Sequence, residues 1–90
     1  MGLMSVVKDG FKLDLSPNPT SSYTLVKYDL NGAKKALLTL FNIQGIKVFE
    51  TEILSDRISY TLDTRQLIKG TYVVRLSANG MEKSVKLLVN

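Results

Sequence analysis

Apolar and polar residues alternate in short runs along most of the chain. In residues 11–15, the apolar Phe11, Leu13 and Leu15 alternate with Lys12 and Asp14, as expected for a strand that buries one face. The same alternation recurs over residues 26–30, 36–40, 58–62, 72–76 and 83–89, and a less regular run covers residues 46–53. The pattern predicts seven strands. Their predicted inward residues include Val26, Tyr28, Leu30, Ala36, Leu38, Leu40, Ile58, Tyr60, Leu62, Tyr72, Val74, Leu76, Val85 and Leu87.

Turn-forming residues separate these runs at regular intervals. They lie at residue 10 and over residues 16–19, 31–32, 42–45, 55–56, 69–70 and 79–80. Asn79-Gly80 predicts a two-residue hairpin, because a type I′ turn needs positive φ at both central positions. Asn31-Gly32 predicts a second hairpin or a longer loop. Seven antiparallel strands favour an all-β, immunoglobulin-like sandwich over a closed barrel, and a helix over residues 33–40 is the alternative.

The length of the chain allows one core. Its 90 residues, 44% hydrophobic and 22% charged, are typical of a single globular domain. We assign residues 11–90 to the folded domain and residues 1–10 to a linker or cloning remnant, which lacks the features of a signal peptide. Because no run approaches about 20 apolar residues, we expect no direct insertion into a membrane.

The net charge of +4 raises the question of an anionic partner. The 12 basic residues are dispersed, and only Lys34 and Lys35 are adjacent. Since nucleic-acid sites cluster basic and aromatic residues, we expect a solvated surface and no nucleic acid.

Residues that commonly perform catalysis or bind metals are scarce. The chain contains no His and no Cys, which removes the usual nucleophile–base pairs and the preferred ligands of zinc. Glu50 and Glu52 could resemble a glycosidase pair, but a small sandwich offers no deep cleft, and solvated charges are the simpler interpretation. We therefore expect no enzyme activity, no metal and no cofactor.

Four short motifs follow one another along the chain. They are Pro17-Asn18-Pro19, Asn42-Ile43-Gln44-Gly45, Leu67-Ile68-Lys69-Gly70-Thr71-Tyr72, and a final run from Lys86 to Asn90. The two prolines fix the backbone, Asn42 suits a turn, and Gly70 permits a sharp entry into the strand that carries Tyr72. The first three motifs are therefore expected to be mainly structural.

In this order and spacing, the motifs resemble the type A C-terminal sorting domain of the type IX secretion system. The resemblance covers residues 13–90 and implies that the domain directs a fused passenger through the outer membrane. It implies transit through the periplasm and recognition by outer-membrane translocon and shuttle proteins. It also implies removal at the cell surface by a sortase-like peptidase, with the passenger attached to the surface or secreted.

Direct recognition is assigned to the end of the chain. We expect Lys86, Leu88, Val89 and Asn90 to carry sorting information, with Lys86 facing solvent between inward-facing Val85 and Leu87. A partner could add a strand at this edge, and the isolated domain could form a dimer through this edge or through the edge of the strand over residues 11–15. Two other interpretations stay open: a fibronectin-like or carbohydrate-binding module, for which Tyr23 and Phe41 are the candidate aromatic residues, and a spacer without recognition.

Overall fold

The computed structural model describes residues 11–90, and the predicted linker over residues 1–10 lies outside the described residues. The seven-stranded all-β prediction is confirmed. The strands are β1 (Lys12–Ser16), β2 (Tyr23–Asp29), β3 (Lys35–Asn42), β4 (Lys47–Leu54), β5 (Ser59–Asp63), β6 (Gly70–Ala78) and β7 (Met81–Val89). No helix in the described part of the chain is long and apolar enough to cross a membrane.

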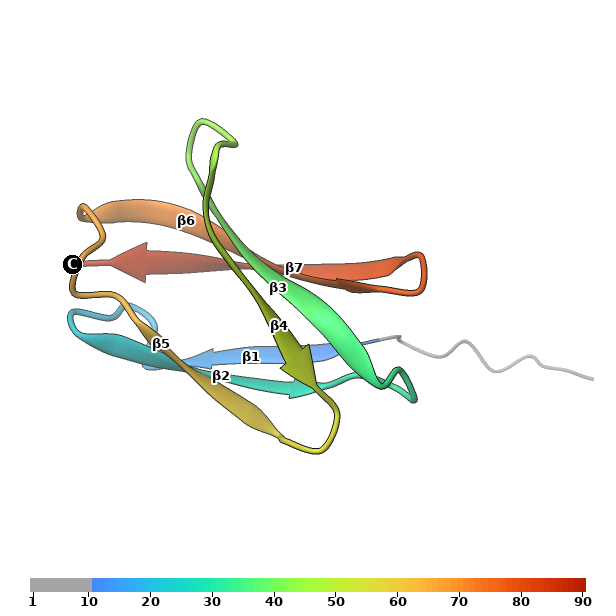
Figure 1. Ribbon diagram of the computed structural model, residues 1–90. Coiled ribbons are helices and arrows are strands. Elements are labelled where there is room, and N and C mark those ends of the chain that lie inside the picture. The colour runs from blue at the N-terminus through green and yellow to red at the C-terminus, as the bar shows by residue number, and fades with distance from the viewer. Residues whose placement is uncertain (1–10) are drawn as a thin grey trace, which may run out of the picture.

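The strands form two antiparallel sheets that face each other as a sandwich (Figure 1). One sheet has the order β1-β2-β5, and the other has the order β4-β3-β6-β7. The β3–β4 hairpin extends beyond the body of the sandwich at one end. This arrangement agrees with the predicted immunoglobulin-like sandwich.

The core lies between the inward faces that the alternation predicts. Buried residues from both sheets include Phe11, Leu15, Val26, Tyr28, Leu38, Leu40, Ile53, Leu62, Tyr72, Val74, Leu76, Leu87 and Val89. Buried threonines are held by hydrogen bonds: the Thr24 hydroxyl donates to the Pro17 carbonyl oxygen at 2.9 Å. Such pairing removes the cost of burying a polar group.

The two Asn-Gly turns have similar backbone angles, but one joins paired strands of one sheet and the other joins strands of different sheets. Asn79 and Gly80 have φ of 53° and 78° and join β6 to β7 as predicted. Asn31 and Gly32 also have positive φ, of 52° and 92°, yet β2 and β3 belong to different sheets. Of the two alternatives for Asn31-Gly32, the hairpin is therefore wrong and the longer loop is confirmed, since β2 ends at Asp29 and β3 begins at Lys35. A turn fixes the local chain reversal and not the pairing of the strands that follow.

The strand predicted over residues 36–40 is confirmed as part of β3, and the helical alternative is excluded. The irregular run in β4 results from a β-bulge, since Leu40 pairs with Phe49 and Phe41 with Lys47, which leaves Val48 as the extra residue. Ile58 was predicted to face inward but is 80% exposed, because β5 begins one residue later and Ile58 still belongs to the turn.

Candidate functional site

The Pro17-Asn18-Pro19 motif lies against the outer edge of β7. The Asn18 side chain bridges two backbone groups of that strand: Nδ2 donates to the Lys86 carbonyl oxygen at 2.8 Å, and Oδ1 accepts from the Leu88 N–H at 3.0 Å. Pro17, Asn18 and Pro19 are all exposed. The motif therefore connects two distant parts of the chain as well as turning it.

Thr20 continues this contact beside the last residues of the chain. Its N–H donates to the Leu88 carbonyl oxygen at 2.9 Å, and its carbonyl oxygen accepts from the Asn90 N–H at 2.8 Å, so that Thr20 and Val89 form a parallel bridge. We call residues 18–20 with their four bonds to residues 86–90 the clasp. The expected strand addition at an open edge is thus corrected, because the clasp already uses the backbone groups there.

The four residues expected to carry recognition differ in accessibility. Lys86 and Leu88 are exposed on the outer face of the four-stranded sheet, whereas Val89 is only 4% exposed and belongs to the core. Asn90 is exposed while its backbone is held by the clasp. Since the Val89 side chain faces the core, only the other three side chains are accessible to a partner of the folded domain.

The Asn42–Gly45 motif builds the tip of the β3–β4 hairpin. Asn42 Oδ1 accepts from the N–H groups of Gln44 at 2.9 Å and Ile46 at 3.0 Å, the Asx-turn pattern predicted for this residue. Gly45 has φ of 82°, which a residue with a side chain rarely adopts. The tip presents Ile43, which is 81% exposed, so the motif holds an apolar side chain in solvent.

The Leu67–Tyr72 motif forms the corner that leads into β6. Tyr72 is buried, and its hydroxyl donates to the Ile68 carbonyl oxygen four residues upstream, which is the arrangement called a tyrosine corner. Gly70, with φ of 151°, begins the strand, and the half-buried Leu67 contacts the core. These residues fix the entry of β6, in agreement with the structural role predicted for them.

A cluster on the outer face of the same sheet was not identified from the sequence. The guanidinium carbon of Arg75 on β6 lies 4.5 Å from the centroid of the Phe41 ring on β3, a cation–π contact. Beside it, the buried Thr39 hydroxyl donates to Glu50 Oε2 at 2.9 Å. This bond and the neighbouring Lys47 lower the pKa of Glu50. The register between β3, β4 and β6 brings these residues together. The sequence alone does not show this register, so it could not predict the cluster.

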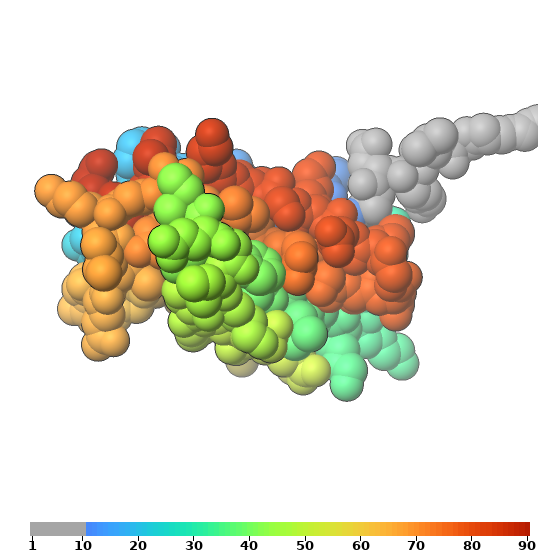
Figure 2. All heavy atoms as spheres, turned by 90° about the horizontal axis from the view of Figure 1, so that it is seen from above, coloured from blue at the N-terminus to red at the C-terminus, as the bar shows by residue number. Residues whose placement is uncertain are grey.

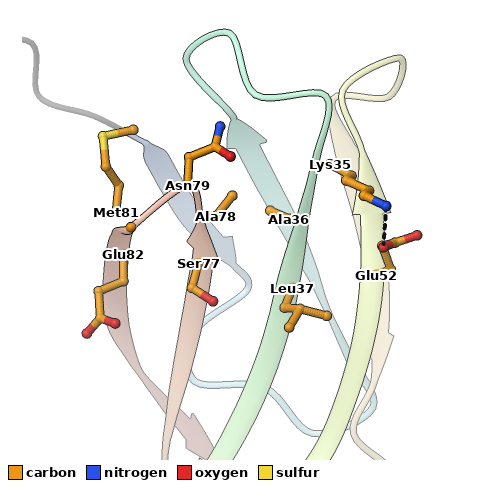
Figure 3. Close-up of a pocket in the computed structure, with 10 residues that line it drawn as sticks. Lys35, Ala36, Leu37, Glu52, Ser77, Ala78, Asn79, Met81 and Glu82 are labelled. Atoms are coloured by element: carbon orange, nitrogen blue, oxygen red, sulfur yellow. Dashed lines mark ion pairs between the residues drawn. The ribbon is translucent and has the colours of Figure 1, made fainter.

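The outer face of the four-stranded sheet carries two shallow depressions. The larger, of about 590 Å³, lies near the β6–β7 hairpin. Figure 3 shows the Lys35–Glu52 ion pair on one side, Leu37 and Ser77 in the middle, and Met81 on the far side. The ion pair spans 3.7 Å between exposed side chains, and such pairs contribute little to stability. The side chains surround an open surface and form no convergent polar site.

The second depression, of about 420 Å³, lies where the hairpin tip meets the start of β6. Its lining is Phe41, Asn42, Ile43, Gly45, Thr71, Val73 and Arg75. Figure 2 looks onto this sheet and shows the light-green β3–β4 hairpin beside the orange β6. Residues of two motifs therefore border one surface, next to the strand that carries Lys86 and Leu88.

Comparison with known protein families assigns this domain to a family. The family model described as a secretion system C-terminal sorting domain matches residues 14–90. The chain belongs to this family. The resemblance drawn from the four motifs is thereby confirmed, and all four lie within the matched residues. None of the curated proteins compared with the chain matches it significantly.

The sorting domain functions with the type IX secretion system, which exports proteins across the outer membrane. Its family is a sorting-signal family and not a catalytic one. Among residues 11–90, no group of three or more His, Cys, Asp or Glu side chains is arranged to hold a metal ion.

Proposed function

We propose that this sorting domain is read in the periplasm by the outer-membrane translocon and its shuttle proteins, which then export the passenger fused in front of it. At the surface, a sortase-like peptidase removes the domain, and the passenger is attached to the surface or released. The observation that carries the proposal is that the clasp and the Tyr72 corner border β7, the strand that exposes Lys86 and Leu88, while the Asn42–Gly45 tip lies on the other side of β6 on the same sheet.

Within this proposal, Lys86 is the residue that the translocon or its shuttle proteins contact most directly. Its side chain is exposed and Val73, across the ladder on β6, is half-buried. A surface replacement of this kind normally changes the free energy of unfolding by less than about 0.5 kcal/mol. Lys86→Ala should therefore remain folded and lose only the contact with a partner. Deleting residues 88–90 is a poorer test, because it also removes three of the four clasp bonds and the core residue Val89.

The experiment fuses the domain to a reporter that carries its own inner-membrane export signal. In cells with a working type IX system, we expect the fused reporter at the surface or in the medium and the unfused reporter in the periplasm. Mass spectrometry of the delivered reporter should show that the domain has been removed. Equal delivery without the domain would contradict the proposal, as would periplasmic retention of a fusion whose domain is folded.

A binding-module function has no comparable support. Its candidate aromatic residues lie in different sheets, since Tyr23 is in β2 and Phe41 in β3, so they form no shared row. A dimer of the isolated domain could use the edge of β1 or the part of the β7 edge that the clasp leaves open. The alternation of the ladder places the outward backbone groups of that part at Glu82 and Ser84.

A further inference from the structure

Four exposed or half-exposed apolar side chains lie close together on the outer face of the four-stranded sheet. The register places Phe41, Val73 and Lys86 in one row across β3, β6 and β7, and Thr71 and Leu88 in the next. Leu88 is 43% exposed, and Ile43 at the hairpin tip is more exposed still. We call the set Phe41, Ile43, Val73, Arg75, Lys86 and Leu88 the cationic face.

The positive charges of the cationic face are only partly balanced in the described chain, since Arg75 acts on Glu50 at a distance and helps to lower the pKa of that carboxyl. Neither Arg75 nor Lys86 forms an ion pair within residues 11–90, and the buried Nε of Arg75 has no hydrogen-bond partner there. Glu50, a carboxylate of the same face, is already engaged by Thr39 and Lys47. Because Arg75 and Lys86 are diagonal neighbours across the ladder, one carboxylate-bearing segment can reach both.

The cationic face also offers a place for an apolar side chain. The depression of about 420 Å³ lies between the hairpin tip and β6, with Phe41, Ile43 and Val73 in its lining. An exposed apolar patch bordered by polar groups is typical of a protein contact. The adjacent β7 edge is closed to strand addition by the clasp over residues 86–90, so a partner reaches Lys86 through its side chain.

We propose that the cationic face binds a protein segment that presents a carboxylate next to an apolar side chain. The carboxylate pairs with Arg75 and Lys86, and the apolar side chain enters the depression beside Phe41 and Val73. This inference rests on the proposed function, since the segment would belong to the secretion machinery. Long-range attraction by the two cations would speed the encounter, and the apolar contact would slow release.

The test in cells compares two matched double variants of the fused domain. Lys86→Glu with Leu88→Ser alters the cationic face, whereas Lys27→Glu with Ile58→Ser makes the same charge reversal and a comparable apolar-to-polar change at exposed positions outside it. Thermal melting first establishes that both variants fold. We expect the first to leave the reporter in the periplasm and the second to deliver it as the unaltered domain does.

The outcomes separate this inference from the proposed function. If the unaltered domain fails to deliver the reporter, the proposed function is wrong. If the unaltered domain and both folded variants deliver it equally, only the cationic face is wrong. Loss of delivery with both variants would also overturn the assignment to this face.

A binding experiment then tests the chemistry of the partner. The probe is a capped peptide of alternating glutamate and leucine, compared with its glutamine–leucine counterpart and with anionic and zwitterionic lipid vesicles. We expect the glutamate peptide to shift the amide resonances of Phe41, Val73 and Lys86, and Lys86→Glu to weaken its affinity by about tenfold or more. Equal binding of the glutamine peptide, preference for anionic vesicles, or no saturable binding would each overturn the proposal.

Discussion

Asn18 provides the sharpest test of how the clasp stabilises the domain. Asn18→Ala removes two hydrogen bonds to β7, of 2.8 and 3.0 Å, each with a net contribution of roughly 0.5–1.5 kcal/mol. Because Asn18 is exposed, water can partly replace the lost partners, and the expected loss is about 1–2 kcal/mol. For a domain of this size, that lowers the melting temperature by about 5–10 °C.

Two further measurements make the Asn18 prediction specific. The Leu88 amide should exchange its hydrogen faster in Asn18→Ala, because Oδ1 no longer accepts from it. Asn18→Asp should destabilise more than Asn18→Ala at neutral pH, since it places a carboxylate oxygen against the Lys86 carbonyl oxygen. The control is Ser21→Ala, an exposed position of the same connection, which should melt as the unaltered domain does. An unchanged melting temperature together with unchanged Leu88 exchange in Asn18→Ala would refute the clasp.

Tyr72→Phe should lower the free energy of unfolding by about 0.5–1.5 kcal/mol through the lost bond to the Ile68 carbonyl, and Tyr72→Ala by about 3–5 kcal/mol. The control is Tyr23→Phe, at a half-exposed ring, which should change the free energy of unfolding little in denaturant melts. Equal losses at the two tyrosines would contradict the stabilising role of the Tyr72 hydroxyl. Gly45→Ala should cost roughly 1–2 kcal/mol, because φ is 82° and a Cβ there meets no atom within 4 Å, so that backbone strain is the whole effect; an unchanged melt would argue against that turn. The hydrogen bonds from Arg65 lower the pKa of Asp63 to about 2. The stabilisation from a depressed pKa is present at higher pH and is lost as the pH falls from the ordinary value of 3.8 through about 2. NMR of the Asp63 carboxyl should show this titration, and Arg65→Gln should raise the pKa of Asp63.

The sequence predicts local structure well wherever one face of a strand is buried. In β2, β3 and β6 apolar residues occupy every second position, with further apolar residues between some of them, and the structure buries Val26, Leu38 and Val74 as that period requires. The Asn79-Gly80 turn and the Asn42 turn are equally local, because each depends only on the backbone of a few consecutive residues.

Features that depend on long-range pairing could not be predicted in this way. The Asn31-Gly32 turn has the expected backbone but connects two sheets, and the bulge at Val48 depends on what β3 places opposite it. The contact between Phe41 and Arg75 joins residues on two strands whose register no short window contains. Ile58 fits the alternation and is nevertheless exposed, because periodicity does not show where a strand begins.

The clasp determines how the domain responds to mechanical force. Residues 18–20 run parallel to residues 88–90, and Thr20 bridges Val89 in that direction. The passenger precedes β1, so a load between the passenger and a holder at the end of β7 pulls the two segments past each other along their length. The four clasp bonds then bear the load together and must break together. Peeling apart an antiparallel hairpin instead breaks its bonds one after another. The clasp is thus placed to keep the sorting domain folded while its passenger is under tension.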